Sequence, residues 1–254
     1  MCYRRPLFFA IAAALLCAGL ATAVLGQATA VKQNDAVVPV PRDSGTWMGR
    51  HAGMNERVKQ GNVDLLMIGD SITHGWESRG KNVWAKYYEK RNAVNLGIGG
   101  DRTQHVLWRL DNGNIDGISP KLAVLMIGTN NSNSNTSEEI AEGVKAIVEK
   151  LRTKLPEMKV LVLAIFPRGA DNNDAKRQIN QKANEIIAEL ADGKNVFFLD
   201  INQKFLTPEG VLTKEVMPDF LHPHEMGYGI WAEAMEPTIT KLMGVSSSLI
   251  REEP

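Results

Sequence analysis

Residues 63–76 read VDLLMIGDSITHGW, an apolar run that ends at Gly69 and continues directly into Asp70 and Ser71. A continuous apolar run that stops at a glycine is typical of a strand buried on both faces, as in a parallel sheet. The Asp-Ser pair after the strand has two interpretations. It is more often an ordinary turn whose side chains bind nearby backbone, but a serine there can also be an exposed nucleophile.

The rest of the chain alternates between strand-like and helix-like patterns. Further apolar runs of strand character occur at 93–97, 122–128, 160–166 and 196–200. Helical patterns occur at 83–90, 104–110, 136–155, 174–191 and 227–244. Thr136 and Glu139 form a capping-box pattern at the start of one of these helices. Strands that alternate with helices predict an α/β fold, in which a five-stranded parallel sheet is covered on both faces.

The N-terminus has the pattern of an export signal. Arg4 and Arg5 precede a long Ala/Leu-rich stretch, and small residues suited to cleavage follow at 28–30. The apolar run from Leu7 to Leu25 is also long enough for an uncleaved membrane anchor, which remains the alternative. The predicted organisation is a signal peptide (1–30), a proline-containing linker (31–44), one folded domain (45–245) and a tail (246–254). We therefore expect a secreted or periplasmic protein with no stable membrane association after cleavage.

Composition narrows the class of protein further. Both cysteines, Cys2 and Cys17, lie in the export segment, so the mature chain has neither a disulfide nor a Cys-based metal site. The chain is 44% hydrophobic, and its length is sufficient for one hydrophobic core. The formal net charge is zero and basic residues are not clustered, which argues against a nucleic-acid partner. The sequence leaves the oligomeric state open.

Polar residues follow the predicted strands, where parallel sheets bind their ligands. Four segments supply them: Ser71 after the first strand, Gly99–Asp101 after the second, Thr129–Asn131 after the third, and Asp219–His224 before the last helix. Taken singly, each segment is a capped turn. Together they bring a hydroxyl, backbone N–H groups, an amide, an imidazole and a carboxylate to one edge of the sheet.

These groups are the ones that acyl transfer requires. Ser71 is the predicted nucleophile, His222 the base that takes its proton, and Asp219 the carboxylate that orients the base. His224 competes for the role of base, but it lies five residues after Asp219, whereas His222 lies three after it. The predicted oxyanion donors are the backbone N–H groups of Ser71 and Gly100 and the side-chain amide of Asn130.

No cofactor or metal ion is expected. GWESRGKN (75–82) resembles a phosphate-binding loop, but Asn82 stands where a hydroxyl is required. GIGGDR (97–102) lacks the third glycine of a dinucleotide fingerprint. His74 and His224 are a possible metal pair, but no third ligand has suitable spacing.

Four short blocks in this order resemble the SGNH (GDSL-like) hydrolases, in particular the platelet-activating factor acetylhydrolase-like esterases. The blocks are GDSIT, NLGIGGD, GTNN and DFLH, spread over residues 69–222. The resemblance implies a flavodoxin-like three-layer α/β/α fold and serine ester hydrolysis. It assigns the same roles to Ser71, His222 and Asp219, and the oxyanion donors to Ser71, Gly100 and Asn130. Thr129 and Asn131 depart from the third block of many members, which have Gly and Asp there.

We expect a small acyl group, such as acetyl, on a small-molecule or carbohydrate ester. Ile72, Thr129 and Leu221 are each adjacent in sequence to a predicted catalytic group and can restrict the space behind the carbonyl. The alternative is that Ile72 and Leu221 pack into the core. The alternative functions are a lysophospholipase or thioesterase, an acyltransferase, or a non-catalytic extracellular binding domain on the same fold.

Overall fold

The computed structural model describes Met1 and residues 33–244. Except for Met1, the predicted signal peptide (1–30) lies outside the described residues, as does the tail (246–254). Within the described part, a five-stranded parallel sheet has the order β2-β1-β3-β4-β5. The strands are β1 (Leu65–Gly69), β2 (Ala93–Gly97), β3 (Leu122–Met126), β4 (Lys159–Leu163) and β5 (Val196–Leu199). The predicted α/β fold is confirmed.

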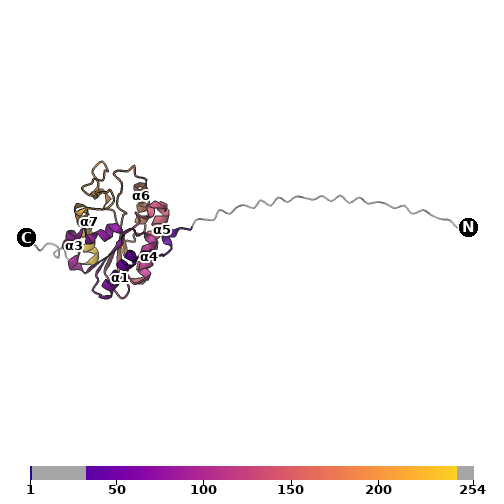
Figure 1. Cartoon of the computed structure of the whole chain (residues 1–254), viewed down its shortest axis with the longest axis horizontal. Coiled ribbons are helices and arrows are strands. Elements are labelled where there is room, and N and C mark those ends of the chain that lie inside the picture. Colours follow the sequence, from indigo (N-terminus) through magenta and orange to yellow (C-terminus); the bar gives the residue numbers. More distant parts are fainter. Residues whose placement is uncertain (2–32, 245–254) are drawn as a thin grey trace, which may run out of the picture. The chain divides into compact units, whose positions relative to one another are not determined.

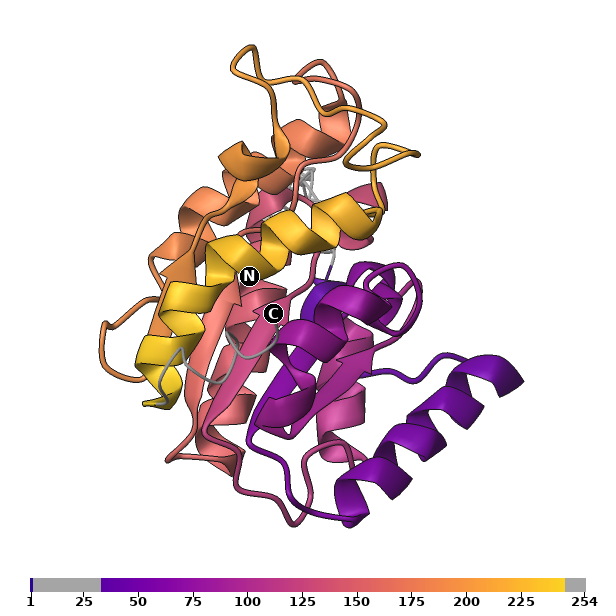
Figure 2. The same cartoon turned by 90° about the vertical axis from the view of Figure 1, so that its left-hand side faces the viewer.

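Helices cover both faces of this sheet, which makes the domain a three-layer α/β/α structure. The helices are α1 (Gly45–Lys59), α2 (Ser71–His74), α3 (Lys81–Tyr87), α4 (Thr103–Asp111), α5 (Ser137–Lys154), α6 (Ala175–Ala188) and α7 (Glu225–Met243). Figure 1 shows α3 and α7 on one side and α4 and α5 on the other, and Figure 2 shows α7 in yellow across the near face. Among residues 33–244, no helix has both the length and the apolar character that a membrane crossing requires.

Strand β1 shows how one apolar run contributes to two hydrophobic cores. Leu66 and Ile68 belong to the core cluster that also contains residues of α1, α4 and α5. Leu65 and Met67 belong to the cluster that contains residues of α7. Successive side chains of a strand point to opposite faces, so a strand between two helical layers must be apolar at every position.

The predicted capping box is present at the start of α5. The Glu139 N–H donates to the Thr136 hydroxyl at 3.2 Å, and the Thr136 N–H donates to the Glu139 carboxylate at 3.0 Å. Each residue thereby satisfies a backbone N–H that has no partner within the helix. This local signal correctly predicted the beginning of the helix.

The structure differs from the expected linker over residues 31–44. From Asn34 onward this segment packs on the domain, and Ala36 is fully buried. The Ala36 carbonyl accepts a hydrogen bond from the Thr103 hydroxyl at 2.7 Å, and the Val40 N–H donates to the Gln104 carbonyl at 3.3 Å. The segment is therefore part of the folded domain, because α4 and α5 supply partners that its own sequence does not reveal.

Candidate functional site

The first strand delivers Ser71 to the carboxyl edge of the sheet through a tight turn. Asp70 caps α2, its Oδ1 accepting the Ile72 N–H at 2.9 Å, and Ser71 is the first residue of that helix. Gly69 is required because a Cβ there would lie 2.1 Å from the Thr73 hydroxyl. The Ser71 N–H has no partner within α2, since the first backbone N–H groups of any helix lack one.

A chain of hydrogen bonds joins Ser71 to a segment that is 151 residues away in sequence. The Ser71 Oγ lies 2.9 Å from His222 Nε2, and His222 Nδ1 lies 2.7 Å from Asp219 Oδ2. A carboxylate beside Nδ1 holds the imidazole proton on that nitrogen. Nε2 is then left as an acceptor for the Ser71 hydroxyl proton, which is the arrangement that a base needs.

Asp219 is itself held by the backbone of the same turn. Its Oδ1 accepts the N–H groups of Leu221 at 3.1 Å and His222 at 2.7 Å, while Phe220 between them has a positive φ of 56°. Burial raises the pKa of Asp219, but the hydrogen bonds from His222 and Leu221 outweigh burial, so the pKa lies below the usual value. Asp219 therefore stays ionised around neutral pH and can orient His222.

His224, the competing histidine, is not part of this chain. It is exposed at the start of α7, and its backbone N–H donates to the Val216 carbonyl at 2.9 Å. The spacing of three residues from Asp219 favoured His222 over His224, and the structure brings His222 to Ser71.

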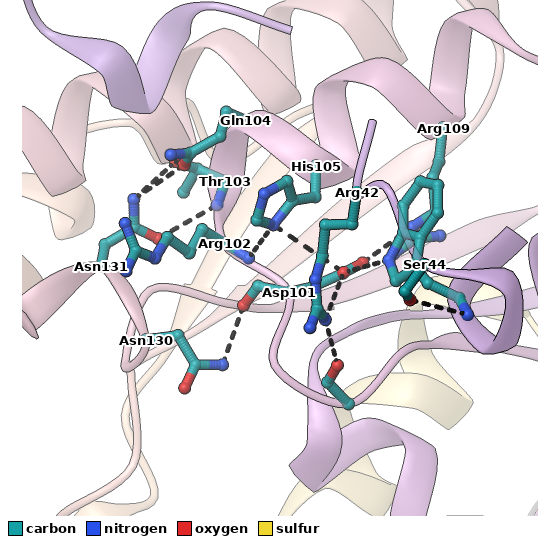
Figure 3. Close-up of polar contacts among 12 residues, drawn as sticks. Arg42, Ser44, Asp101, Arg102, Thr103, Gln104, His105, Arg109, Asn130 and Asn131 are labelled. Atoms are coloured by element: carbon teal, nitrogen blue, oxygen red, sulfur yellow. Dashed lines mark hydrogen bonds and ion pairs between the residues drawn. The ribbon is translucent and has the colours of Figure 1, made fainter. Parts of the chain in front are cut away.

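The predicted oxyanion donors are Gly100, in the loop after β2, and Asn130, in the loop after β3, and a hydrogen bond joins the two loops. The Asp101 N–H closes a turn onto the Ile98 carbonyl at 3.2 Å, and Gly100 within it has a φ of 77° that favours glycine. The Asn130 amide donates to the Asp101 carbonyl at 2.9 Å (Figure 3). An amide nitrogen carries two protons, so this bond leaves one N–H of Asn130 for a ligand.

A buried ionic cluster supports this loop from behind. The Asp101 carboxylate accepts hydrogen bonds from the Trp47 indole at 2.6 Å and from the fully buried Arg109 at 2.9 Å (Figure 3). Burial raises the pKa of Asp101, and Arg109 opposes that rise. These contacts hold the loop that carries Gly100 in place. Trp47 and Arg109 were missed, because neither residue has a local pattern that indicates its partner.

His105 borders the same cluster but is not a candidate base. Burial, together with the positive charges of Arg42 and Arg102, lowers its pKa to about 4. The neutral ring accepts the Arg102 N–H on Nδ1 at 2.9 Å. The ring thus has a structural role at the beginning of α4.

Two of the three residues expected to contact the acyl group are buried elsewhere. Ile72 is 1% exposed and belongs to the core cluster on the α7 side. Thr129 is also 1% exposed, and its hydroxyl accepts a hydrogen bond from Arg168 at 3.2 Å. The expectation that Ile72 and Thr129 line the cleft is therefore wrong, since adjacency in sequence does not determine which way a side chain points. Leu221 is half-buried and packs against the same core cluster as Ile72, as the alternative expected, while part of its side chain stays exposed.

Asp70 is expected to make stability depend on pH. Burial raises its pKa to about 7, and one of its oxygens has no hydrogen-bond partner. Between about pH 4 and 7 the unfolded chain loses this proton while the folded chain keeps it, so stability falls as pH rises. We predict that Asp70→Asn stabilises the protein relative to wild type by up to about 4 kcal/mol at pH 8 and far less at pH 4.5.

Thermal melting of Asp70→Asn and wild type from pH 4.5 to 8 tests this prediction. Asp64→Asn is the control of opposite sign, because hydrogen bonding from Asn92 lowers the pKa of Asp64. That variant should be destabilised near neutral pH and lose the difference as pH falls below about 4. A difference between Asp70→Asn and wild type that stays constant with pH would contradict the prediction.

Comparison with known proteins places this site in a family. The family model described as GDSL-like Lipase/Acylhydrolase matches residues 67–230, which include Ser71, Gly100, Asn130, Asp219 and His222. The chain belongs to the GDSL-like lipase/acylhydrolase family. The family membership predicted from the four sequence blocks is confirmed. Membership of this family makes the protein an ester hydrolase.

Curated relatives of this GDSL-like protein match most of its length. Platelet-activating factor acetylhydrolase IB subunit alpha1 of Pongo abelii is 35% identical over 220 residues, which cover 84% of this chain and 92% of that protein. The alpha2 subunit of Rattus norvegicus is 37% identical over 198 residues, covering 78% and 85% respectively.

Solved structures share the fold. A GDSL-like lipase from Bacteroides thetaiotaomicron aligns with a TM-score of 0.59 and 20% identity, covering 76% of this chain and 97% of that one. A variant of an acetylxylan esterase from Geobacillus stearothermophilus aligns with a TM-score of 0.57 and 18% identity, covering 76% and 98%.

Across residues 33–244, no group of three His, Cys, Asp or Glu side chains is arranged to hold a metal ion.

Proposed function

We propose that this GDSL-like hydrolase is a secreted or periplasmic serine esterase that removes small acyl groups, chiefly acetyl, from small-molecule or carbohydrate esters. The observation that carries the proposal is the hydrogen-bonded chain Ser71–His222–Asp219, with distances of 2.9 and 2.7 Å. Nucleophile, base and orienting carboxylate are within hydrogen-bond reach of one another, as acyl transfer requires.

The proposed reaction follows from this geometry. The Ser71 Oγ attacks the ester carbonyl carbon while His222 Nε2 takes the hydroxyl proton. The N–H groups of Ser71 and Gly100 and the Asn130 amide stabilise the resulting oxyanion. His222 then returns the proton to the alcohol oxygen as the C–O bond breaks, which leaves an acyl group on Ser71. A water molecule, deprotonated by His222, releases the carboxylic acid and restores the serine.

The preference for acetyl is supported by the relatives of the chain. Relatives that are 35% and 37% identical are named as acetylhydrolases. We further propose that Leu221, which packs against the core cluster on the α7 side and stays partly exposed, limits the space for the acyl group. Export is proposed on the N-terminal pattern of residues 1–30 alone, and N-terminal sequencing of protein recovered outside the cytoplasm tests it.

Labelling with a fluorophosphonate probe tests the serine mechanism. Wild type should be labelled at Ser71, and Ser71→Ala should not be labelled. A folded wild type that is neither labelled nor active on any ester would instead support the second candidate, a non-catalytic binding domain on the same fold.

Acyl length is the second test of the proposal. Acetyl esters should exceed octanoyl esters in kcat/KM by about tenfold or more, because forcing methylenes into a packed site costs roughly 1–3 kcal/mol. Leu221→Ala should narrow this ratio. The control is Leu190→Ala, which truncates a half-buried leucine packed against the cluster that contains residues of α1, α4 and α5, and it should leave the ratio unchanged. A wild type that prefers octanoyl esters contradicts the proposed acyl specificity.

A further inference from the structure

Arg42 reaches from the N-terminal segment into the loop that carries Gly100. Its Nη1 donates to the Gly99 carbonyl at 2.5 Å and lies 3.7 Å from the Asp101 carboxylate (Figure 3). The Arg42 side chain is 36% exposed, so its guanidinium lies between solvent and the buried cluster. The mechanism proposed above gives this residue no role.

The hydrogen bond from Arg42 to the Gly99 carbonyl also determines the direction of the Gly100 N–H. The Gly99 carbonyl and the Gly100 N–H belong to one planar trans peptide unit, in which the C=O and N–H bonds point in opposite directions. A guanidinium that holds the carbonyl on one side therefore directs the Gly100 N–H away from Arg42. That N–H is one of the proposed oxyanion donors.

The loop is otherwise easy to rotate at this position. Two glycines in succession, Gly99 and Gly100, leave the peptide between them without a side chain on either flank, and glycine has the widest choice of backbone angles. The next carbonyl, that of Asp101, is held by Asn130 at 2.9 Å. Among the interactions that the structure describes, Arg42 provides the hydrogen bond to the Gly99 carbonyl, and Asn130 provides the one to Asp101.

The contacts around Arg42 fit a fixed position for its guanidinium. The Asp101 carboxylate, which also accepts from Trp47 and Arg109, supplies the opposite charge. A Cβ on Gly100 would lie 2.9 Å from Arg42 Nη1, so the guanidinium packs directly on this glycine. Two residues before Arg42, the Val40 N–H donates to the Gln104 carbonyl at 3.3 Å, which attaches the backbone of this segment to α4.

We propose that Arg42 is a positioning residue that holds the Gly99–Gly100 peptide with its N–H directed at the oxyanion of the acyl-transfer intermediates. The inference rests on the serine esterase function proposed above. Arg42 acts through Gly100 and does not touch the substrate. Its loss should therefore weaken stabilisation of the transition state and leave substrate binding nearly intact.

The test compares Arg42→Met and Arg42→Lys with wild type on an acetyl ester. Arg42→Met keeps the apolar stem and removes every donor, and kcat should fall about 10–100-fold while KM changes less than about threefold. Arg42→Lys keeps one donor and should retain more activity than Arg42→Met. The rate of fluorophosphonate labelling should fall in parallel with kcat, because the phosphonyl oxygen occupies the same donors.

Two further measurements separate positioning from a general loss of structure. Guanidinium ion at millimolar concentration should restore part of the kcat of an Arg42→Ala variant, since the site is open to solvent. The same salt should not activate Ser71→Ala. Arg57→Ala is the matched control: Arg57 also donates to a backbone carbonyl, that of Gly61 at 2.9 Å, and its removal should leave kcat and KM unchanged.

The outcomes discriminate between the two proposals. An active wild type whose kcat is unchanged in Arg42→Met overturns the role of Arg42 and leaves the serine mechanism in place. A rise in KM with unchanged kcat makes Arg42 a substrate contact and also overturns the inference. A wild type that neither hydrolyses esters nor reacts with the probe overturns the proposed function, and the role of Arg42 with it.

Discussion

Ser71→Ala is expected to lower kcat for ester hydrolysis by about 10³–10⁶-fold, and His222→Ala to lower it by a similar factor. The two side chains act as one unit at 2.9 Å, because neither a serine without a base nor a base without a nucleophile can form the acyl-enzyme. The double variant should therefore be no slower than the slower single variant. Steady-state kinetics on an acetyl ester, with circular dichroism to verify folding, provide the measurement.

His224→Ala is the matched control for this prediction. It removes a second imidazole two residues from the proposed base, but that imidazole is exposed and makes no contact with Ser71 among the described interactions. We expect kcat to change by less than about threefold, as for a surface substitution away from the reacting groups. If His224→Ala is as slow as His222→Ala, the assignment of the base is wrong.

Asn130→Ala should reduce kcat by about 10²–10³-fold, which corresponds to roughly 3–4 kcal/mol, with little change in KM. The physical reason is that its free N–H meets an oxygen that becomes fully charged only as the tetrahedral intermediate forms. The substitution also removes the hydrogen bond to the Asp101 carbonyl at 2.9 Å, so part of the loss arises from movement of the Gly100 loop.

Asn133→Ala is the control within the same loop. Asn133 is exposed, and its amide donates to the Asn130 carbonyl at 3.0 Å without reaching the loop after β2. This variant should keep nearly all of the wild-type kcat. An Asn130→Ala variant whose KM rises while kcat is unchanged would identify Asn130 as a ligand for the ground-state substrate instead of an oxyanion donor.

The sequence by itself determined the elements whose signals are local. The run 93–97 coincides with β2, and Thr136 with Glu139 marks the beginning of α5. Both signals can be recognised within one turn or one strand, although β2 itself pairs with the distant strand β1. The rule that parallel sheets bind ligands beyond the carboxyl ends of their strands also predicted that Ser71 would lie near His222, and the structure places the two side chains 2.9 Å apart.

Tertiary structure alone decided the orientation of side chains and the contacts between distant segments. Ile72 is adjacent to Ser71, yet the first turn of α2 directs one side chain to His222 and buries the other. Helix α1 was not predicted, because three glycines weaken its pattern and packing of Trp47 and Met54 stabilises it. Arg42 meets Gly99 across 57 residues. No local pattern encodes such a contact, since it exists only once the N-terminal segment has packed against α4 and α5.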